Sequence, residues 1–470
     1  DSFASINSTS YSYANGKYYF GNYLDRKFSG FGKVTSIDDD GNKIITSFHG
    51  GTQNEPEYGE YQDHISKMGK PYRVEVKSSN GNLYSKTINK WERADLGSGR
   101  NFVKQTRAIN FAYDGNSTHK DKAELYDYDN SSGNKTQIES RGEVFANDDG
   151  SLVDNMYNDV LITTISYTNN TSNGVIGLPV TELTTDINSV KVNETKHYYD
   201  NLVLGQVGNG NETKTEFWRA GSKYIDTEKS YNSFGLVVTE KDPRDKETSY
   251  TYDSFNLYPV TSTNPLSQVT SFTYDYSSGQ IKETTDVNSR VYSTVFDGLD
   301  RPIEVKQPDV SNPSSSVTKA TYQYTNTANA VRIKQSDYLS GSNIVDTYTY
   351  LDGFGRKIQE RKESEAANIY NVRDFIYTQH NLLLKESLPY SSNNTARTSA
   401  TTTTSLYTTY SYDPMQRVLS AVSVVGSTSN AYDDWKTTVT DTDGKTKAMY
   451  RDAYDNLAKV DEHNGSATYT

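Results

Sequence analysis

The sequence predicts an all-β protein in which consecutive β-hairpins join into one long, curled and continuous sheet. The main observation is a repeated phrase. Residues 242–253 read DPRDKETSYTYD, residues 264–275 NPLSQVTSFTYD, residues 286–297 DVNSRVYSTVFD and residues 441–452 DTDGKTKAMYRD. The first three copies start 22 residues apart (264 − 242 and 286 − 264). A fixed period of about 20 to 50 residues indicates one supersecondary unit stacked many times.

The composition is the second observation. Only 33% of the 470 residues are hydrophobic and the mean hydropathy is −0.80, values that by themselves favour disorder. The chain nevertheless has 39 tyrosines, whereas disordered chains are poor in aromatic residues. Tyrosine, threonine, valine and isoleucine are typical of a pleated, half-solvated sheet. We therefore expect an ordered sheet with much solvated surface.

The charge and the residue usage exclude several classes of protein. The net charge is −12 and no basic run occurs, which argues against nucleic-acid binding. The chain has no cysteine, so disulfides and thiolate metal sites are excluded. The sequence has no run of 18 apolar residues, so it predicts no membrane-spanning helix, and no signal peptide is recognisable. Because the chain starts at Asp1 and ends within a repeat, we expect a piece of a larger protein, truncated at both ends.

The second half of each unit is a ten-residue phrase that opens on an aromatic residue or leucine. It occurs at residues 231–240 (YNSFGLVVTE), 252–261 (YDSFNLYPVT), 296–305 (FDGLDRPIEV), 351–360 (LDGFGRKIQE), 377–386 (YTQHNLLLKE) and 412–421 (YDPMQRVLSA). A leucine or arginine stands five residues after each opening position. Glycine, aspartate, asparagine and proline at the two ends supply turn geometry, so each unit is a strand, a short turn, a strand and a second turn. We expect strands of about 8 residues, each about 25 Å long.

A lone hairpin cannot bury its apolar face, so the hairpins must pair edge to edge along the chain. Such pairing also covers the strand edges that would otherwise promote aggregation. The right-handed twist of about 20 to 25° between neighbouring strands then curls the ribbon into a spiral or shell.

The chain divides into a less periodic part, residues 1–230, and the repeat array, residues 231–470. In the first part, residues 72–76 with 83–87 and residues 126–133 with 134–138 predict hairpins. In the second, the polar stretches 311–316 and 391–405 are interpreted as loop insertions at hairpin tips. An interdomain linker near Ser391 is the alternative. No amphipathic helix of more than three turns is expected.

Two acidic segments and the repeated aspartates are candidates for chemistry. Residues 38–42 (DDDGN) suggest calcium, but the spacing does not fit an EF-hand, so an acidic β-turn is preferred there and at residues 147–150 (NDDG). The repeated carboxylates resemble the pairs used in glycoside hydrolysis. Their recurrence argues instead for a structural role in Asx turns, since a catalytic pair is needed once. They are Asp253, Asp275, Asp297, Asp352 and Asp413.

The histidines do not predict a metal site. None of the six has an HExxH or other zinc spacing, and His49 is interpreted as a structural residue in a packed turn. No phosphate-binding glycine loop and no nucleophile elbow occur. We therefore expect no catalytic residue, no metal and no cofactor, and thus no enzyme.

The chain resembles a known family at these residues. The phrases Tyr-Asp-x-x-Gly and Asp-Gly-Phe-Gly-Arg are similar to the tyrosine-aspartate (YD) or Rhs repeat. Residues 25–34 (DRKFSGFGKV), 46–51 (TSFHGG) and 69–76 (GKPYRVEV) resemble the middle region of the B component of Tc insecticidal toxin complexes and of SpvB-like proteins. The positions that carry this second likeness are Phe28, Gly30, Phe31, Gly32, Phe48, His49 and Gly51.

The resemblance implies a fold and a function. Residues 1–230 would be the Tc-B-like middle region that starts the wall, and residues 231–470 a YD/Rhs array that forms part of a hollow Rhs-type shell. In the family the shell encloses a C-terminal toxic domain and is not itself a catalyst. The implied partners are this cargo, the remaining shell segments, an upstream propeller and a pore-forming translocation subunit, and the implied location is secreted or at the cell surface. The propeller and the Asp-Pro-rich autoproteolytic end of the family are missing from this sequence.

The repeat positions are interpreted as structural. We expect the aromatic residues Tyr252, Tyr274, Phe296 and Tyr412 to stack in ladders across strands, and Arg301, Arg356 and Arg417 to help hold the hairpins in register. One alternative is a cell-surface YD-repeat adhesin that binds glycans through outward-facing tyrosines. A second is a β-rich polysaccharide-cleaving enzyme, which would need a unique carboxylate pair that the sequence does not offer.

Overall fold

The computed structural model describes residues 8–51, 55–154, 159–327, 330–340, 343–398, 406–464 and 467–469. These residues form 35 strands and three short 3₁₀ helices, η1 (Pro56–Tyr58), η2 (Ile65–Lys67) and η3 (Thr171–Asn173). The predicted all-β fold is confirmed. No helix in the described ranges is long and apolar enough to cross a membrane.

The strands of the less periodic part are longer than those of the repeat array. They are β1 (Ser10–Phe20), β2 (Arg26–Ile37), β3 (Lys43–Phe48), β4 (Pro71–Lys77), β5 (Leu83–Asp95), β6 (Asn101–Ala112), β7 (Lys120–Tyr128), β8 (Lys135–Ala146), β9 (Leu152–Asp154), β10 (Leu161–Asn170), β11 (Val175–Asp186), β12 (Lys191–Tyr199), β13 (Glu212–Ala220) and β14 (Lys223–Tyr231). The hairpins predicted at residues 72–87 and 126–138 are β4–β5 and β7–β8.

The repeat array follows without a break, because β14 pairs with β15. Its strands are β15 (Val237–Lys241), β16 (Glu247–Tyr252), β17 (Pro259–Thr263), β18 (Val269–Tyr274), β19 (Ile281–Thr285), β20 (Val291–Phe296), β21 (Pro302–Pro308), β22 (Ser316–Thr327), β23 (Ala330–Ser340), β24 (Asn343–Leu351), β25 (Lys357–Glu363), β26 (Tyr370–Tyr377), β27 (Leu383–Ser387), β28 (Tyr390–Ser392), β29 (Tyr407–Tyr412), β30 (Val418–Ser423), β31 (Gly426–Asp433), β32 (Lys436–Thr440), β33 (Thr446–Arg451), β34 (Leu457–Asn464) and β35 (Ala467–Tyr469).

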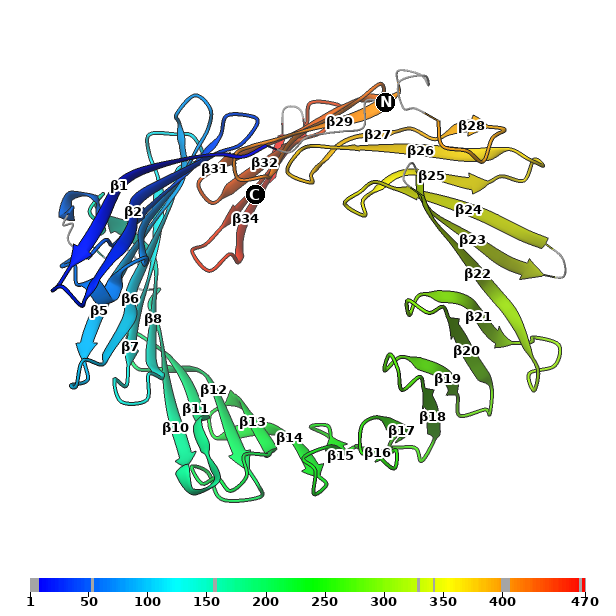
Figure 1. Cartoon of the computed structure of the whole chain (residues 1–470), viewed down its shortest axis with the longest axis horizontal. Helices are drawn as coiled ribbons and strands as arrows, with labels where there is room; N and C mark the ends of the chain where they lie inside the picture. Colours follow the sequence, from blue (N-terminus) through cyan, green and yellow to red (C-terminus); the bar gives the residue numbers. More distant parts are fainter. Residues whose placement is uncertain are drawn as a thin grey trace.

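The sheet is an antiparallel meander with two side branches. Each strand pairs with the next along the chain, except that β8 pairs with both β9 and β10 and that β26 pairs with both β27 and β28. Strand β29 then continues the ribbon from β27. Figure 1 shows the strands following one another around a ring, with the orange and red C-terminal strands returning to the blue N-terminal ones. The predicted curled, continuous sheet is confirmed.

Strands β15 to β20 have five or six residues rather than the expected 8, so that prediction is wrong. The reason lies in the turns. In the hairpin β20–β21, Asp297 N–H donates to the Arg301 carbonyl and Asp300 N–H donates to the Asp297 carbonyl. This type I turn with a bulge takes three residues between its closing pair, and a similar turn closes the other edge. A 22-residue period then leaves only five or six residues for each strand.

The fourth turn position has a positive φ in every such hairpin. It is +59° at Asp300, +64° at Gln416 and +78° at Gly355. We expect Gly355→Val to destabilise the β24–β25 hairpin by about 1–2 kcal/mol, because a β-branched residue adopts this conformation poorly. Gly355→Asn is the matched control and should cost much less, since asparagine tolerates it and no atom lies within 4 Å of the added Cβ. Amide hydrogen exchange in this hairpin measures both, and equal protection in the two variants would contradict the expectation.

Two regions of the sheet have a buried core. Ile88, Ile109, Phe111, Ala123, Val144 and Ala146 pack together on strands β5 to β8. A second cluster on β24 to β26 comprises Tyr348, Tyr350, Tyr370 and Val372. Each lies where a connecting segment folds back over the ribbon, whereas the residues of β15 to β18 are half-buried or exposed. Burial therefore depends on these excursions as well as on the sheet.

The two polar insertions have different structures. Residues 311–315 form the turn between β21 and β22, as expected for a hairpin tip. Residues 390–392 form β28, a strand that the polar composition did not predict. The residues 399–405 of the same insertion lie outside the described part of the chain.

Candidate functional site

The repeated aspartates close the turns of the hairpins. Asp297 Oδ1 accepts the backbone N–H groups of Leu299 and Arg301 at 2.9 and 3.0 Å, and Oδ2 accepts Arg301 Nε at 2.8 Å. The hydrogen bonds from the Arg301 side chain and backbone lower the pKa of Asp297 to about 2. Asp253, Asp352 and Asp413 accept the same two backbone N–H groups in their turns, and Asp275 accepts the N–H of Ser277. The predicted Asx turns are present.

The repeat arginines connect one hairpin to the next. Arg301 and Arg417 lie 4.1 and 4.0 Å from the ring centres of Tyr324 and Tyr432. Arg356 lies 4.9 Å from that of Tyr377. Each guanidinium thus forms an ion pair with the aspartate of its own turn. It also lies over a tyrosine ring further along the ribbon, which is a favourable cation–π contact. That these ion pairs and cation–π contacts set the strand register stays a prediction.

The hydroxyl groups of the repeat tyrosines donate hydrogen bonds to backbone carbonyls of earlier strands. Tyr252 donates to the Val237 carbonyl at 2.8 Å and Tyr274 to the Pro259 carbonyl at 2.9 Å. Tyr412 likewise donates to the Leu383 carbonyl at 2.7 Å. The ring of Tyr274 stacks on Tyr258, with centroids 4.6 Å apart. Phe296 ends β20 and has no hydroxyl, so its unit lacks this bond.

The first family phrase lies in the hairpin β1–β2. Phe28 and Phe31 are exposed on β2 and their rings meet edge to face with centroids 5.2 Å apart. Gly30, between them, has a φ of +90°, while Gly32 is buried. The glycine permits the local bulge that brings both rings to the same side of the strand.

The second family phrase ends β3 and leads into a long connection that returns at β4. Phe48 is the last residue of β3 and the next residue, His49, is 1% exposed. His49 Nδ1 lies 3.4 Å from Glu60 Oε1 and 3.5 Å from Asp63 Oδ1. Gly51 has a φ of +79°, and a Cβ there would come within 2.8 Å of Ile65 Cδ1. His49 lies in a packed turn, and the sequence did not indicate its two acidic neighbours.

The pKa values of this cluster are displaced. Burial alone lowers the pKa of His49, but the nearby carboxylates of Asp63 and Glu60 outweigh it and the pKa is raised. Burial raises the pKa of Glu60. The pKa of Asp63 is lowered, because His49 and the Gly51 N–H outweigh the effect of burial.

A second ionic cluster fastens the acidic turn at residues 147–150 onto β4 and β5. Arg73 Nη2 contacts Glu75 Oε1 at 2.6 Å and Asp148 Oδ1 at 3.0 Å. Lys86, 1% exposed, contacts the same Asp148 oxygen at 2.5 Å, and Lys77 contacts Glu75 at 2.8 Å. The expected β-turn is present, since Gly150 N–H donates to the Asn147 carbonyl.

This cluster predicts an acid-dependent loss of stability. Burial raises the pKa of Glu75, but the hydrogen bond from Lys77 and the charge of Arg73 outweigh it and hold the pKa below 4.5. Because the folded pKa is the lower one, the stabilisation is fully present above pH 4.5 and is lost as the pH falls through the folded pKa. We expect Glu75→Gln to have a lower thermal unfolding midpoint than the wild type at neutral pH. The difference between the two midpoints, the gap, should narrow on acidification. Thermal unfolding across this range measures it, with the exposed Glu283→Gln as control, which should track the wild type. A gap that is unchanged at acid pH would contradict the prediction.

The two ends of the ribbon meet in a seam formed by turns that are far apart in the sequence. Arg417 Nη2 contacts Asp114 Oδ1 at 2.7 Å, and Asn116 Nδ2 donates to Asp433 Oδ1 at 3.1 Å. Other seam contacts are His380 Nε2 to Asp38 Oδ2 at 3.3 Å, Ser85 Oγ to Met415 Sδ at 3.4 Å, Tyr454 OH to the Ser140 carbonyl at 2.9 Å and Lys120 Nζ to the Trp435 ring centre at 4.8 Å. The seam thus spans four successive hairpins of the C-terminal part.

The connectivity explains how this seam forms. Alternate turns of a meander lie at the same edge of the ribbon. The turns β2–β3, β4–β5 and β6–β7 lie at one edge, and the turns β26–β27, β29–β30, β31–β32 and β33–β34 lie at the opposite edge. The ribbon therefore advances as it turns, and its later part rests edge on edge on its beginning (Figure 1).

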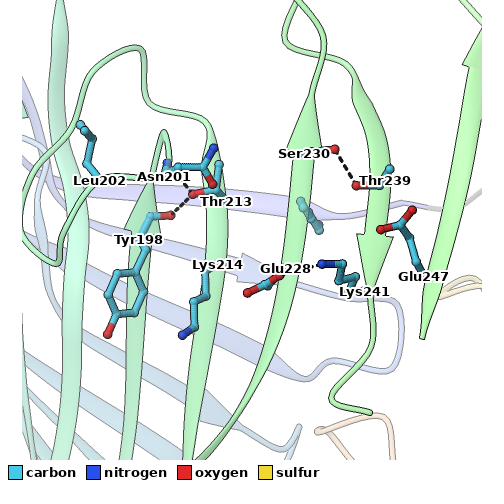
Figure 2. A pocket seen from close by; sticks show the side chains of 11 residues that line it. Tyr198, Asn201, Leu202, Thr213, Lys214, Glu228, Ser230, Thr239, Lys241 and Glu247 are labelled. Carbon is cyan, nitrogen blue, oxygen red and sulfur yellow. Dashed lines mark hydrogen bonds and ion pairs between the residues drawn. The ribbon is translucent and has the colours of Figure 1, made fainter. Parts of the chain in front are cut away.

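A depression of about 380 Å³ lies over strands β12 to β16. Lys214, Glu228, Lys241 and Glu247 are directly opposite one another on successive strands, and Figure 2 shows them in a row beside Tyr198. Lys241 Nζ lies 3.3 Å from Glu228 Oε2. Hydrogen bonds to Glu216 and Asp226 raise the pKa of Lys214 despite the opposing effect of burial. The arrangement is a ladder of paired cross-strand charges.

No family model matches the chain, and no curated protein matches it. Solved structures do match. The crystal structure of TcdB2-TccC3 aligns with a TM-score of 0.76 at 13% identity and covers 98% of this chain and 33% of its own. TcdB2-TccC3 without its hypervariable C-terminal region gives 0.77 at 12% identity over 98% of this chain and 35% of its own. The Tc holotoxin pore of Photorhabdus luminescens gives 0.76 at 12% identity over 97% and 34%.

The chain spans about a third of the length of the structures it matches. At 12–13% identity the likeness concerns the fold, and it covers the less periodic part and the repeat array together. The resemblance inferred from the YD phrases and from the N-terminal motifs is thereby confirmed at the level of architecture. In fold, this chain is similar to the TcdB2-TccC3 structures over nearly its whole length.

Proposed function

We propose that this chain is a wall segment of a secreted Rhs- or Tc-type toxin that encloses a C-terminal toxic cargo for delivery. The observation that carries the proposal is the seam. A continuous ribbon whose later turns contact the turns at its beginning makes a wall that continues across the place where the two parts meet. Such a wall separates two sides, which is what a container requires.

The wall acts without catalysis in this proposal. The repeated carboxylates that could have served as acid and base are occupied by the turns they close. The charges in the depression over strands β12 to β16 lie opposite one another on neighbouring strands. These features support a structural role.

The partners follow from the proposed role. The cargo and further shell segments would complete the container, since this chain spans only a third of the matched structures. An upstream propeller and a pore-forming translocation subunit would deliver it, as the likeness to a holotoxin pore suggests. Release would require the wall to open, and the seam is the contact whose opening would break no pairing within the ribbon.

Limited proteolysis of the full natural product with intact-mass analysis tests the proposal. The expected result is a C-terminal fragment that is cleaved from the shell, yet copurifies with it and resists protease. A single unclipped chain whose C-terminus is readily digested would contradict encapsulation. Retention of that chain on a glycan array would then favour the surface adhesin.

A further inference from the structure

The connection between β3 and β4, residues 49–70, contains three ionisable side chains whose free atoms face one another. His49 is 1% exposed, Glu60 is 1% exposed and the Asp63 side chain is 3% exposed. Both ring nitrogens of His49, Oε1 of Glu60 and Oδ1 of Asp63 make no hydrogen bond within the described part of the chain. Buried polar atoms normally have partners, so four unsatisfied atoms at one point need an explanation.

The other carboxylate oxygens are already used, and this orients the free ones. Glu60 Oε2 accepts the Glu55 N–H at 2.6 Å. Asp63 Oδ2 accepts the N–H groups of Gly50 and Gly51 at 3.2 and 2.8 Å. Fixing one oxygen of each carboxylate leaves the second directed at His49. Backbone hydrogen bonds of this kind are typical of the groups that orient metal ligands.

We propose that His49, Glu60 and Asp63 bind a divalent transition-metal ion, with zinc the best match. Zinc binds imidazole nitrogen and carboxylate oxygen at about 2.0–2.2 Å, so two ligands of a tetrahedral site lie about 3.3–3.6 Å apart. The Nδ1–Oε1 and Nδ1–Oδ1 distances are 3.4 and 3.5 Å, and all three ligand atoms lie within 4.8 Å of one another. A mixed set of one imidazole and two carboxylates suits zinc better than calcium, which prefers oxygen alone.

The neighbouring charges leave room for a cation. The two carboxylates contribute two negative charges, and Lys67 is the nearby basic residue on the same connection. Its ammonium group donates to the Gln62 carbonyl and is thereby held. When His49 is in the neutral form that binds a metal, the group therefore keeps one negative charge. A proton on His49 is the competing occupant of this space.

The site would fasten a segment that has little regular structure of its own. Residues 49–51 and 55–70, the described part of this connection, contain only η1 and η2, yet they cover the sheet. The Tyr58 carbonyl accepts Arg73 Nη1 at 3.4 Å, and a Cβ on Gly59 would come within 2.7 Å of Ile88 Cγ2. A metal joining the start of the connection to its middle would hold this cover in place, because ligand binding to the folded state alone stabilises that state.

Zinc titration of the intact chain tests the inference. The chelator-dialysed protein is titrated with zinc against a chromophoric competitor, and its thermal midpoint is recorded with and without zinc. We expect about one tight zinc per chain and a rise of the midpoint. Asp63→Asn should weaken zinc binding by at least about tenfold, in line with loss of a charged ligand, and should abolish the rise.

The less buried cluster Asp38, Asp40 and His380 provides the matched control, because its atoms also lie within 4.8 Å of one another. Asp38→Asn should leave the tight zinc in place. Cobalt replaces zinc in a second measurement, and tetrahedral cobalt in the wild type, read from its visible absorption, supports the site even if Asp63→Asn fails to fold. Equal zinc binding by the wild type and a folded Asp63→Asn, loss of zinc in Asp38→Asn, or no tight zinc in the wild type would overturn the proposal and assign the space to a proton.

Discussion

Replacing Arg417 with alanine is expected to weaken the seam between the two ends of the ribbon by about 2–3 kcal/mol. The Arg417 guanidinium contacts Asp413 in its own turn at 2.6 Å and Asp114 across the seam at 2.7 Å. The Asp114 side chain is 4% exposed, so the substitution leaves a buried carboxylate without this partner. Burial lowers the pKa of Arg417, but both carboxylates outweigh this effect and raise it. Amide exchange at residues 84–85 and 113–116 measures the loss.

Arg301→Ala is the matched control for this prediction. Arg301 is as exposed as Arg417, 32% against 31%, and makes the same contacts with the turn aspartate and with a tyrosine ring. Arg301 forms an ion pair within its own turn, with Asp297 at 2.6 Å. Arg301→Ala should therefore leave exchange at residues 113–116 unchanged. Equal effects of the two substitutions there would show that the seam is not held by Arg417.

Replacing Arg361 with leucine is expected to destabilise the second core by about 3–5 kcal/mol. Arg361 is 0% exposed and donates to Gln359 Oε1, Ser392 Oγ, the Asn394 carbonyl and Thr398 Oγ1 at 2.6–3.0 Å. Without the guanidinium these acceptors lose their donor, and residues 392–398 lose their hold on β25. Thermal unfolding and protease sensitivity of residues 388–398 measure the effect.

Arg373→Leu provides the comparison for Arg361. It lies on the neighbouring strand β26, its side chain is 46% exposed and it pairs with Glu386 at 3.1 Å. An exposed pair of this kind contributes about 0–1 kcal/mol, so the variant should unfold nearly as the wild type does. If Arg361→Leu were equally harmless, the segment 388–398 would be held by contacts other than these hydrogen bonds.

The elements that the sequence predicted well are those that depend on local chemistry. The Asp297 carboxylate accepts N–H groups two and four residues further along the chain. The repeated phrase therefore already contains the residues that form the Asx turn. The strand length was overestimated, because the residues of the bulged turn were counted with the strands. The ring ladder expected for Tyr252 and Tyr274 stays a prediction, although Tyr274 stacks on Tyr258. Their hydroxyl groups reach backbone carbonyls about 15 residues back, an option that the residue type allows but the pattern does not specify.

The candidate sites were largely hidden from sequence reasoning. His49 was recognised from its phrase, but Glu60 and Asp63 come from a connection without periodicity, and neither spacing matches a known ligand pattern. Strand β28 is formed by Tyr390-Ser391-Ser392 in a polar stretch, where pairing with β26 outweighs the local preference for a loop. Asp114 and Arg417 lie 303 residues apart. A single sequence contains no signal that two such distant residues are in contact.

The sequence by itself determined the repeating hairpin, its Asx turns and the continuity of the sheet, because each of these depends on residues within one period. It also contains the phrases on which the resemblance to YD-repeat proteins of the Tc type rests, and the fold bears this resemblance out. Only the tertiary structure decided where the ribbon closes and which residues form the seam, because the accumulated twist and curl of many strand pairs sets those positions. It likewise decided the surroundings of His49, because a connecting segment without regular structure takes its path from the sheet on which it packs.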